Sequence, residues 1–124
     1  MILGVGTDLV DVERARRSLE RWGARWARRI FTDSEMEYCE ASRDPAPRYA
    51  ARFAAKEAAF KALPVQPETL QFTHVEVLGG GGKPAIRPLG SVKEALAPLE
   101  PVKILVSLTH EKTLAAAIVI IEKE

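Results

Sequence analysis

The sequence predicts an α+β domain, with a mainly antiparallel sheet of about five strands and helices packed on one side. Alternating apolar residues indicate strands at both ends of the chain and in its second half, where four glycines (residues 79–82) separate two of them. An alanine-rich run over residues 52–62 has the spacing of a helix. Residues 114–121 are apolar on both faces, which predicts a central strand.

The first predicted strand covers residues 2–9. Alternation places Gly4, Gly6 and Asp8 on one of its faces, where another backbone or a ligand has room to come close. Asp8 is therefore either a site carboxylate at a strand end or a helix N-cap, because a helical pattern follows directly.

Three helical segments follow. The first runs from Val12 to Arg29 with a possible break at Gly23. Thr32-Asp33-Ser34-Glu35 is a capping box that opens a short helix ending near Ser42. Asp44-Pro45 then begins the longest helix, with proline at its first position, and Pro64 ends it.

The long helix carries two charges beside its apolar stripe. Winding at 100° per residue puts Tyr49, Phe53 and Phe60 within about 40° of one another. Glu57 and Lys61 fall on the shoulder of that stripe, as expected at the edge of a cleft. They also fit an ordinary i,i+4 ion pair worth about 0.2–0.5 kcal/mol.

The second half of the chain is predicted to be mostly strand. Alternation predicts strands over residues 72–78 and 83–89, on either side of the glycines. Ser91-Val92-Lys93-Glu94 is another capping box, opening a short helix to about Leu96. Two closing strands cover residues 102–110 and 113–121.

Composition points to one soluble domain over residues 1–124. The chain is 47% hydrophobic and 28% charged, and no apolar run is long enough to span a membrane. The N-terminus lacks the basic region of a signal peptide, so we expect a cytoplasmic protein with no membrane partner. Cys39 is the single cysteine; it has no local base, which indicates a packed small residue.

Charge is distributed unevenly. The net charge is +1, yet residues 13–29 hold seven arginines, including Arg14 and Arg21, against two glutamates. A local basic surface on a nearly neutral chain favours a particular acidic partner over general nucleic-acid binding. A solvated helix face is the alternative explanation.

Three segments carry groups suited to phosphate chemistry: Asp8, Glu57 with Lys61, and the strand end from Ser107 to Glu111, which includes His110. Two carboxylates with substrate and water oxygens suit Mg²⁺. Lys61, Lys83 and Arg52 are then available to neutralise phosphates. Taken alone, His110 is equally compatible with a capping or core role.

In this order, the segments resemble the motifs of the holo-acyl-carrier-protein synthases, the small 4'-phosphopantetheinyl transferases. Residues 4–10 with Glu13-Arg14 resemble the opening motif, and Arg52 to Ala62 resembles the second and most specific one. Gly82-Lys83-Pro84 and Ser107 to His110 resemble the other two, so the likeness covers essentially the whole chain. It departs from many members at Leu63 to Pro67, where they have a glycine-rich loop.

The resemblance implies a 4'-phosphopantetheinyl transferase fold and transfer of 4'-phosphopantetheine from coenzyme A to a serine of apo-acyl carrier protein, in fatty acid biosynthesis. It implies that Asp8 and Glu57 hold Mg²⁺ and that Lys61 and His110, with Thr109 beside it, contact the phosphates. Arg52 and Gly82-Lys83-Pro84 would help seat the nucleotide. Arg14, and with it Arg21, would meet the carrier. Family members are homotrimers with active sites between subunits.

For the implied reaction, Glu57 is the first candidate for the base that takes the serine proton, directly or through a metal-bound water, and His110 is the second. Mg²⁺ and Lys61 would stabilise the developing charge.

Two other functions fit the same residues. One is another Mg²⁺-dependent nucleotide phosphotransferase, although a P-loop motif is absent from the sequence. The other is a small oligomeric module whose arginine helix binds nucleic acid, a partner that we do not expect.

Overall fold

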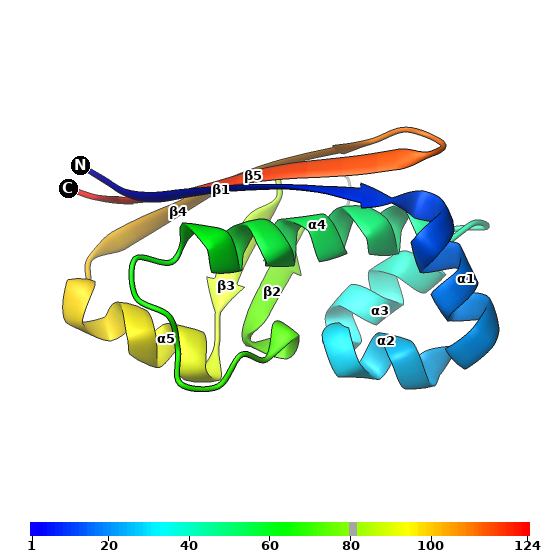
Figure 1. Ribbon diagram of the computed structural model, residues 1–124, viewed down its shortest axis with the longest axis horizontal. Coiled ribbons are helices and arrows are strands. Elements are labelled where there is room, and N and C mark those ends of the chain that lie inside the picture. Colours follow the sequence, from blue (N-terminus) through cyan, green and yellow to red (C-terminus); the bar gives the residue numbers. More distant parts are fainter. Residues whose placement is uncertain (80–81) are drawn as a thin grey trace.

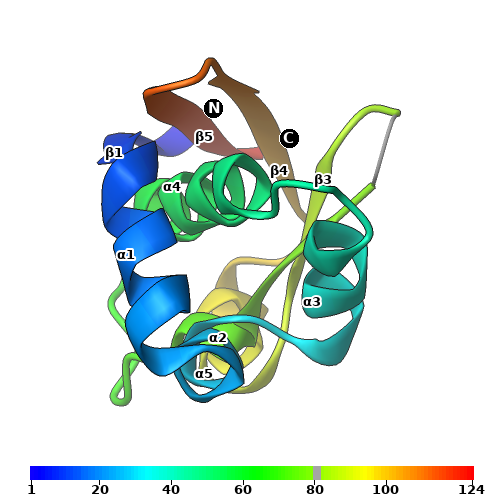
Figure 2. The same ribbon diagram turned by 90° about the vertical axis from the view of Figure 1, so that its right-hand side faces the viewer.

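The computed structural model describes residues 1–79 and 82–124. A three-stranded antiparallel sheet in the order β1-β5-β4 lies on the long helix α4, and a two-stranded sheet of β2 and β3 lies on the other side of that helix with the remaining helices (Figures 1 and 2). The strands are β1 (Ile2–Asp11), β2 (Val75–Leu78), β3 (Ala85–Pro88), β4 (Val102–His110) and β5 (Leu114–Lys123). The helices are α1 (Val12–Trp22), α2 (Ala24–Ile30), α3 (Asp33–Glu40), α4 (Ala46–Ala62) and α5 (Gly90–Leu96).

The α+β class is confirmed, and the five strands pair antiparallel as predicted. They form two sheets, because β2 pairs only with β3 among the described residues and lies beneath α4. Strand β5 is central in the larger sheet, also as predicted. One of its faces, with Val119 and Ile121, is buried in the core that α4 completes.

Helix α4 approaches β1 closely because two glycines face it. A Cβ atom at Gly4 would lie 1.8 Å from the carbonyl oxygen of Ala62, and one at Gly6 would lie 1.9 Å from that of Ala58. The space predicted on this strand face is therefore filled by a helix backbone. Strand β1 therefore packs directly against the backbone of the last two turns of α4, which carry Glu57 and Lys61.

The apolar stripe of α4 faces a core, as predicted. Tyr49 is fully buried against Phe31, with ring centroids 4.8 Å apart, and Phe60 packs edge to face on Phe72 at 5.6 Å. Cys39 is fully buried in the same region, and burial raises the pKa of its thiol to about 12. This confirms that it is a packed residue.

The first helical segment breaks at Gly23, whose φ of 56° favours glycine. The capping box at Thr32 is confirmed, since its hydroxyl accepts from the backbone of Glu35 and the Glu35 side chain accepts from Thr32 N. The long helix begins one residue later than predicted, at Ala46. The carboxylate of Asp44, just before it, accepts a hydrogen bond from Arg16 Nη1 at 2.5 Å.

Two details of the predicted second half are wrong. Residues Phe72–His74 form a 3₁₀ turn rather than the start of a strand. The Nζ of Lys56 donates to the carbonyl oxygens of Phe72, the first residue of the turn, and of Val75, the residue that follows it. The second capping box does not form. Gly90 is already helical, and the hydroxyl of Ser91 donates to the carbonyl oxygen of Thr69 instead.

A buried ion pair that the sequence analysis missed joins three elements under the site. Lys56 and Glu35 are both fully buried and their charged atoms are 2.8 Å apart. The other oxygen of Glu35 accepts the backbone N–H of Val77 at 2.7 Å. Burial lowers the pKa of Lys56, although the Glu35 charge opposes this. The pair locks α4 to α3 and β2.

Across residues 1–79 and 82–124, every helix is too short or too polar to cross a membrane. Gly80 and Gly81, within the predicted glycine turn, lie outside the described residues.

Candidate active site

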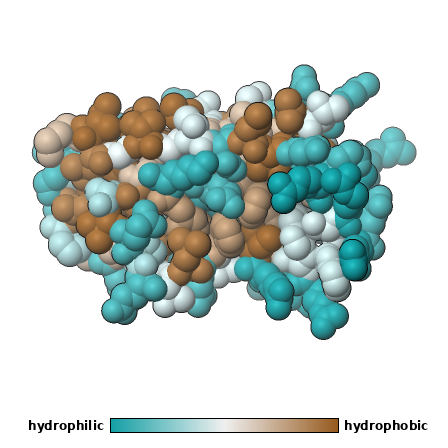
Figure 3. Space-filling view, viewed as in Figure 1, coloured by the Kyte–Doolittle hydropathy of each residue, from teal (hydrophilic) through white to brown (hydrophobic). Residues whose placement is uncertain are grey.

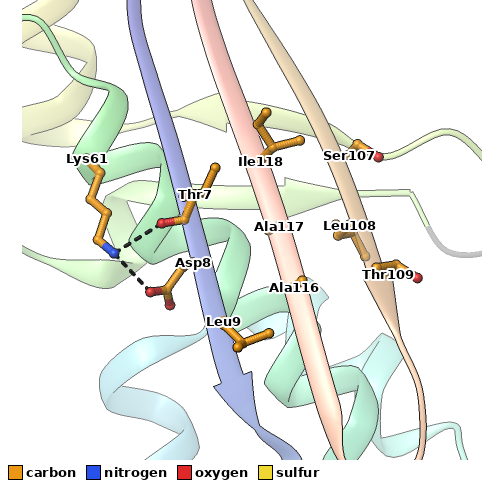
Figure 4. A pocket seen from close by; sticks show the side chains of 10 residues that line it. All are labelled: Thr7, Asp8, Leu9, Lys61, Ser107, Leu108, Thr109, Ala116, Ala117 and Ile118. Atoms are coloured by element: carbon orange, nitrogen blue, oxygen red, sulfur yellow. Dashed lines mark hydrogen bonds and ion pairs between the residues drawn. The ribbon is translucent and has the colours of Figure 1, made fainter.

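Asp8 and Lys61 meet at the edge of the larger sheet. Lys61 Nζ lies 3.1 Å from Asp8 Oδ1 and donates to the carbonyl oxygen of Thr7, also at 3.1 Å (Figure 4). The carboxylate of Asp8 is mostly shielded from solvent at 18% exposure, whereas the Lys61 side chain is 55% exposed. The close contact of β1 with α4 holds the Lys61 ammonium group beside Asp8. Because the Lys61 side chain is exposed, this group is also accessible to an anionic ligand.

Glu57 faces Asp8 in a cleft of about 320 Å³ between β1, α1, α2 and α4. Arg14 and the rings of Trp26 and Phe53 also line this cleft. Partial burial and the negative charge of Asp8 raise the pKa of Glu57, while Lys61 acts in the opposite direction. Asp8, Glu57 and Lys61 are therefore electrostatically coupled.

Two partly shielded carboxylates in one cleft fit a Mg²⁺ ion, which commonly takes one or two carboxylates and fills its remaining positions with water and substrate oxygens. Burial and the repulsion from Asp8 together raise the pKa of Glu57, and the positive charge of a divalent cation would offset both. No cluster of three or more potential metal ligands exists among the described residues, so a fully protein-coordinated site is not formed there. The donor set suits magnesium better than a structural zinc ion.

Thr109 and His110 lie at the opposite edge of the sheet. In the register, Asp8 pairs with Ala117 on β5, which in turn pairs with Leu108 on β4. Two strand spacings, on the order of 10 Å, therefore separate the edges. Thr109 lines a shallow depression of about 610 Å³ with Asp8 and Lys61 (Figure 4). His110 lies at the exposed end of β4 and does not line that depression.

Arg52 and the Gly82-Lys83-Pro84 segment form a third group, on the side of α4 that faces α3. Arg52 is only 4% exposed, and its Nη2 donates to the carbonyl oxygen of Gly79 at 2.8 Å. Gly82 and Lys83 are exposed nearby along the chain. The structure thus brings Arg52 to the start of the β2–β3 connection, but neither Arg52 nor residues 82–84 line the clefts around Asp8.

Arg14 and Arg21 share one face of α1. They line a groove of about 550 Å³ together with Arg17 and Trp22. The guanidinium carbon of Arg21 lies 4.9 Å from the ring centroid of Trp22. Since Arg14 also lines the cleft of Glu57, this basic face is continuous with the site.

Comparison with known proteins decides the family. A model of the 4'-phosphopantetheinyl transferase superfamily matches residues 4–119. The chain belongs to this superfamily. A holo-[acyl-carrier-protein] synthase of Methylorubrum populi is 44% identical over 128 residues, which cover 98% of this chain and 94% of that protein.

Solved structures agree with this transferase assignment. The crystal structure of holo-[acyl-carrier-protein] synthase from Neisseria meningitidis has a TM-score of 0.87 at 30% identity, covering 99% of this chain and all of that chain. A holo-(acyl-carrier-protein) synthase from Bacillus anthracis, in complex with CoA (3',5'-ADP), has a TM-score of 0.80 at 26% identity and covers 100% and 99% of the two chains. The predicted family, fold and enzyme class are confirmed.

Proposed function

We propose that this transferase moves 4'-phosphopantetheine from coenzyme A to a serine of apo-acyl carrier protein, in fatty acid biosynthesis in the cytoplasm. The observation that carries the proposal is the coupling of Asp8, Glu57 and Lys61 in one accessible site, in a chain whose relatives are holo-acyl-carrier-protein synthases. The carrier's serine oxygen attacks the phosphorus that bears pantetheine. The bond from that phosphorus to the bridging oxygen of the pyrophosphate breaks, and adenosine 3',5'-bisphosphate leaves.

Glu57 is the base in this proposal. Its raised pKa makes it a stronger proton acceptor than an ordinary surface carboxylate. It takes the serine proton while Asp8, which shares the cleft, remains paired with Lys61. The aromatic walls of the cleft, Trp26 and Phe53, exclude part of the water around this transfer.

Asp8 and Glu57 are the proposed ligands of Mg²⁺. When bound, the ion supplies positive charge to the pyrophosphate oxygens. Lys61 provides a second positive charge, and its ammonium is free to turn from the Thr7 carbonyl oxygen toward a phosphate because the side chain is half exposed. Arg52, Lys83 and the β2–β3 connection help seat the nucleotide.

The distribution of these groups supports a site between subunits. In one chain Asp8 and Lys61 lie at the β1 edge and share a depression with Thr109, whereas His110 lies at the exposed end of β4, outside that depression. A neighbouring copy that presents its β4 edge to β1 would complete the site. His110 of that copy then contacts a phosphate, which makes it a ligand-binding residue rather than the base.

The outer face of the larger sheet supports a homotrimer built in this way. No described element covers this face, and it carries five exposed apolar side chains: Val5, Leu9, Leu105, Leu114 and Ile118. Hydrophobic side chains gather over the sheet and at the end where the termini lie (Figure 3). Exposed apolar side chains gathered on one face in this way mark an interface. Sedimentation should give a mass near three times 13.7 kDa; a fully active monomer would contradict the trimer.

The activity is tested by measuring adenosine 3',5'-bisphosphate release by chromatography. Release should require coenzyme A, apo-carrier and Mg²⁺ together. Release without a carrier would indicate a hydrolase, and transfer to a nucleotide would indicate the alternative phosphotransferase. A protein that binds RNA or DNA tightly at low salt and releases no nucleotide would be the nucleic-acid module.

A further inference from the structure

Gly79, which follows β2, is held from the long helix by the buried side chain of Arg52. Arg52 Nη2 donates to the carbonyl oxygen of Gly79 at 2.8 Å. Gly79 has a φ of 91°, and a Cβ there would lie 2.8 Å from the carbonyl oxygen of Lys83. The backbone of Gly79, to which Arg52 binds, therefore packs closely against the backbone of Lys83.

Tyr38 supports that guanidinium from α3, which lies on the same side of α4 as the β2–β3 hairpin (Figure 2). The guanidinium carbon of Arg52 is 4.0 Å from the Tyr38 ring centroid, and that of Arg48 is 4.2 Å from it. Arg48 Nη1 also donates to the carbonyl oxygen of Tyr38 at 2.6 Å, in the last turn of α3. One ring is thus held by two arginines one helical turn apart on α4.

Nearby carboxylates are already engaged. Glu35 pairs with Lys56, and Glu40 accepts the hydroxyl of Tyr49 at 2.6 Å. Among the described residues, neither Arg48 nor Arg52 forms an ion pair, and the buried Nε of Arg52 has no hydrogen-bond partner. The Tyr38 ring and the carbonyl oxygen of Gly79 are therefore what fix the Arg52 guanidinium, and cation–π attraction is strongest at such desolvated sites.

We propose that Tyr38 and Arg48 are positioning residues for coenzyme A binding. They fix Arg52, which fixes Gly79 and thereby the backbone that presents Lys83. This inference rests on the proposed function, in which Lys83 and its neighbours seat the nucleotide. Neither Tyr38 nor Arg48 touches the reacting atoms, so the expected effect is on affinity for coenzyme A and not on the rate of the chemical step.

Titration calorimetry with coenzyme A in Mg²⁺ tests the proposal. Tyr38→Leu removes the ring and should weaken binding on the order of tenfold. Tyr38→Phe keeps the ring and should bind coenzyme A with wild-type affinity, because the Tyr38 hydroxyl makes no hydrogen bond with the described residues. In steady-state assays Tyr38→Leu should raise KM for coenzyme A while kcat and the carrier KM stay unchanged.

A double-mutant cycle tests whether Tyr38 affects coenzyme A binding through Lys83. In a Lys83→Met background, Tyr38→Leu should weaken binding by a smaller factor than it does in wild type, because one of the groups through which it acts is gone. Arg48→Gln provides a second test if Tyr38→Leu folds poorly, and should weaken coenzyme A binding in the same direction. Equal affinity of Tyr38→Leu and wild type, or full additivity with Lys83→Met, would overturn the inference. A wild type that binds no coenzyme A would instead overturn the proposed function.

Discussion

Lys61 Nζ and Asp8 Oδ1 are 3.1 Å apart, across the contact between the last turn of α4 and the edge strand β1. The contact is close because Gly4 and Gly6 have no side chains to separate the two elements. A charge pair held by backbone packing is preorganised, since neither element can move without opening the core. Glu57, one helical turn before Lys61, completes this arrangement.

Asp8→Asn and Glu57→Gln should each lower the rate of transfer by on the order of 10²-fold or more, because each removes a proposed metal ligand and Glu57→Gln also removes the proposed base. The fold should persist in both variants. Glu37→Gln, at an exposed position on α3, is the matched control and should retain normal rates. Near-normal transfer by either site variant at limiting Mg²⁺ would contradict the assignment.

Magnesium should also stabilise the fold without any substrate. A cation that binds only the native protein raises the unfolding temperature in proportion to ln(1 + [L]/Kd). We expect this shift in wild type and its loss in Glu57→Gln, measured by thermal unfolding with and without Mg²⁺. An equal shift in both proteins would place the ion elsewhere.

The raised pKa of Glu57 predicts how stability depends on pH. The native state binds this proton more tightly than the unfolded chain, so stability falls as pH rises above the ordinary value of 4.5. Without Mg²⁺, Glu57→Gln should therefore unfold at a higher temperature than wild type at pH 7. The difference should vanish below about pH 4. A variant that is less stable at pH 7 would show that the carboxylate contributes favourable contacts instead.

Lys56→Met should cost about 3–5 kcal/mol of unfolding free energy, because it leaves the fully buried charge of Glu35 without its partner. Urea denaturation measures the loss. Lys93→Met, at an exposed position on α5, is the control and should change stability by less than about 0.5 kcal/mol. A similarly small effect of Lys56→Met would mean that the pair contributes little.

Much of this architecture could be predicted from residue patterns. The break at Gly23, the capping box at Thr32 and the central strand β5 depend on local rules of backbone conformation and periodicity. The predicted capping box at Ser91 does not form because the Ser91 hydroxyl donates to the carbonyl oxygen of Thr69, a contact between distant parts of the chain. The division into two sheets likewise depends on how β2 packs under α4.

The site was predicted in part. Asp8, Glu57 and Lys61 do meet, but periodicity alone does not reveal that His110 lies at the far edge of the sheet, because strand order is a tertiary property. The buried Lys56 did leave a signal. On a helical wheel it lies about 20° from Tyr49, directly beside the apolar stripe and on the side away from Glu57. A lysine at such a position requires a buried partner, which is Glu35.

Charge reversal on α1 tests the carrier surface. Arg14→Glu and Arg21→Glu should raise KM for an acidic carrier and leave KM for coenzyme A nearly unchanged. The wild-type carrier KM should rise with salt, since screening acts over a Debye length of about 10 Å at 0.1 M. An unaltered carrier KM and no salt dependence would exclude this groove as the docking site. The arginines would then be a solvated helix face.

The most direct test of the account is the intact mass of an apo-acyl carrier protein after incubation with this protein, coenzyme A and Mg²⁺. The account predicts a gain of one phosphopantetheine, located on a single serine by fragmentation. Wild type should give complete conversion and Glu57→Gln almost none in the same time. A carrier whose mass does not change with the wild-type protein would contradict the account, as would equal conversion by Glu57→Gln.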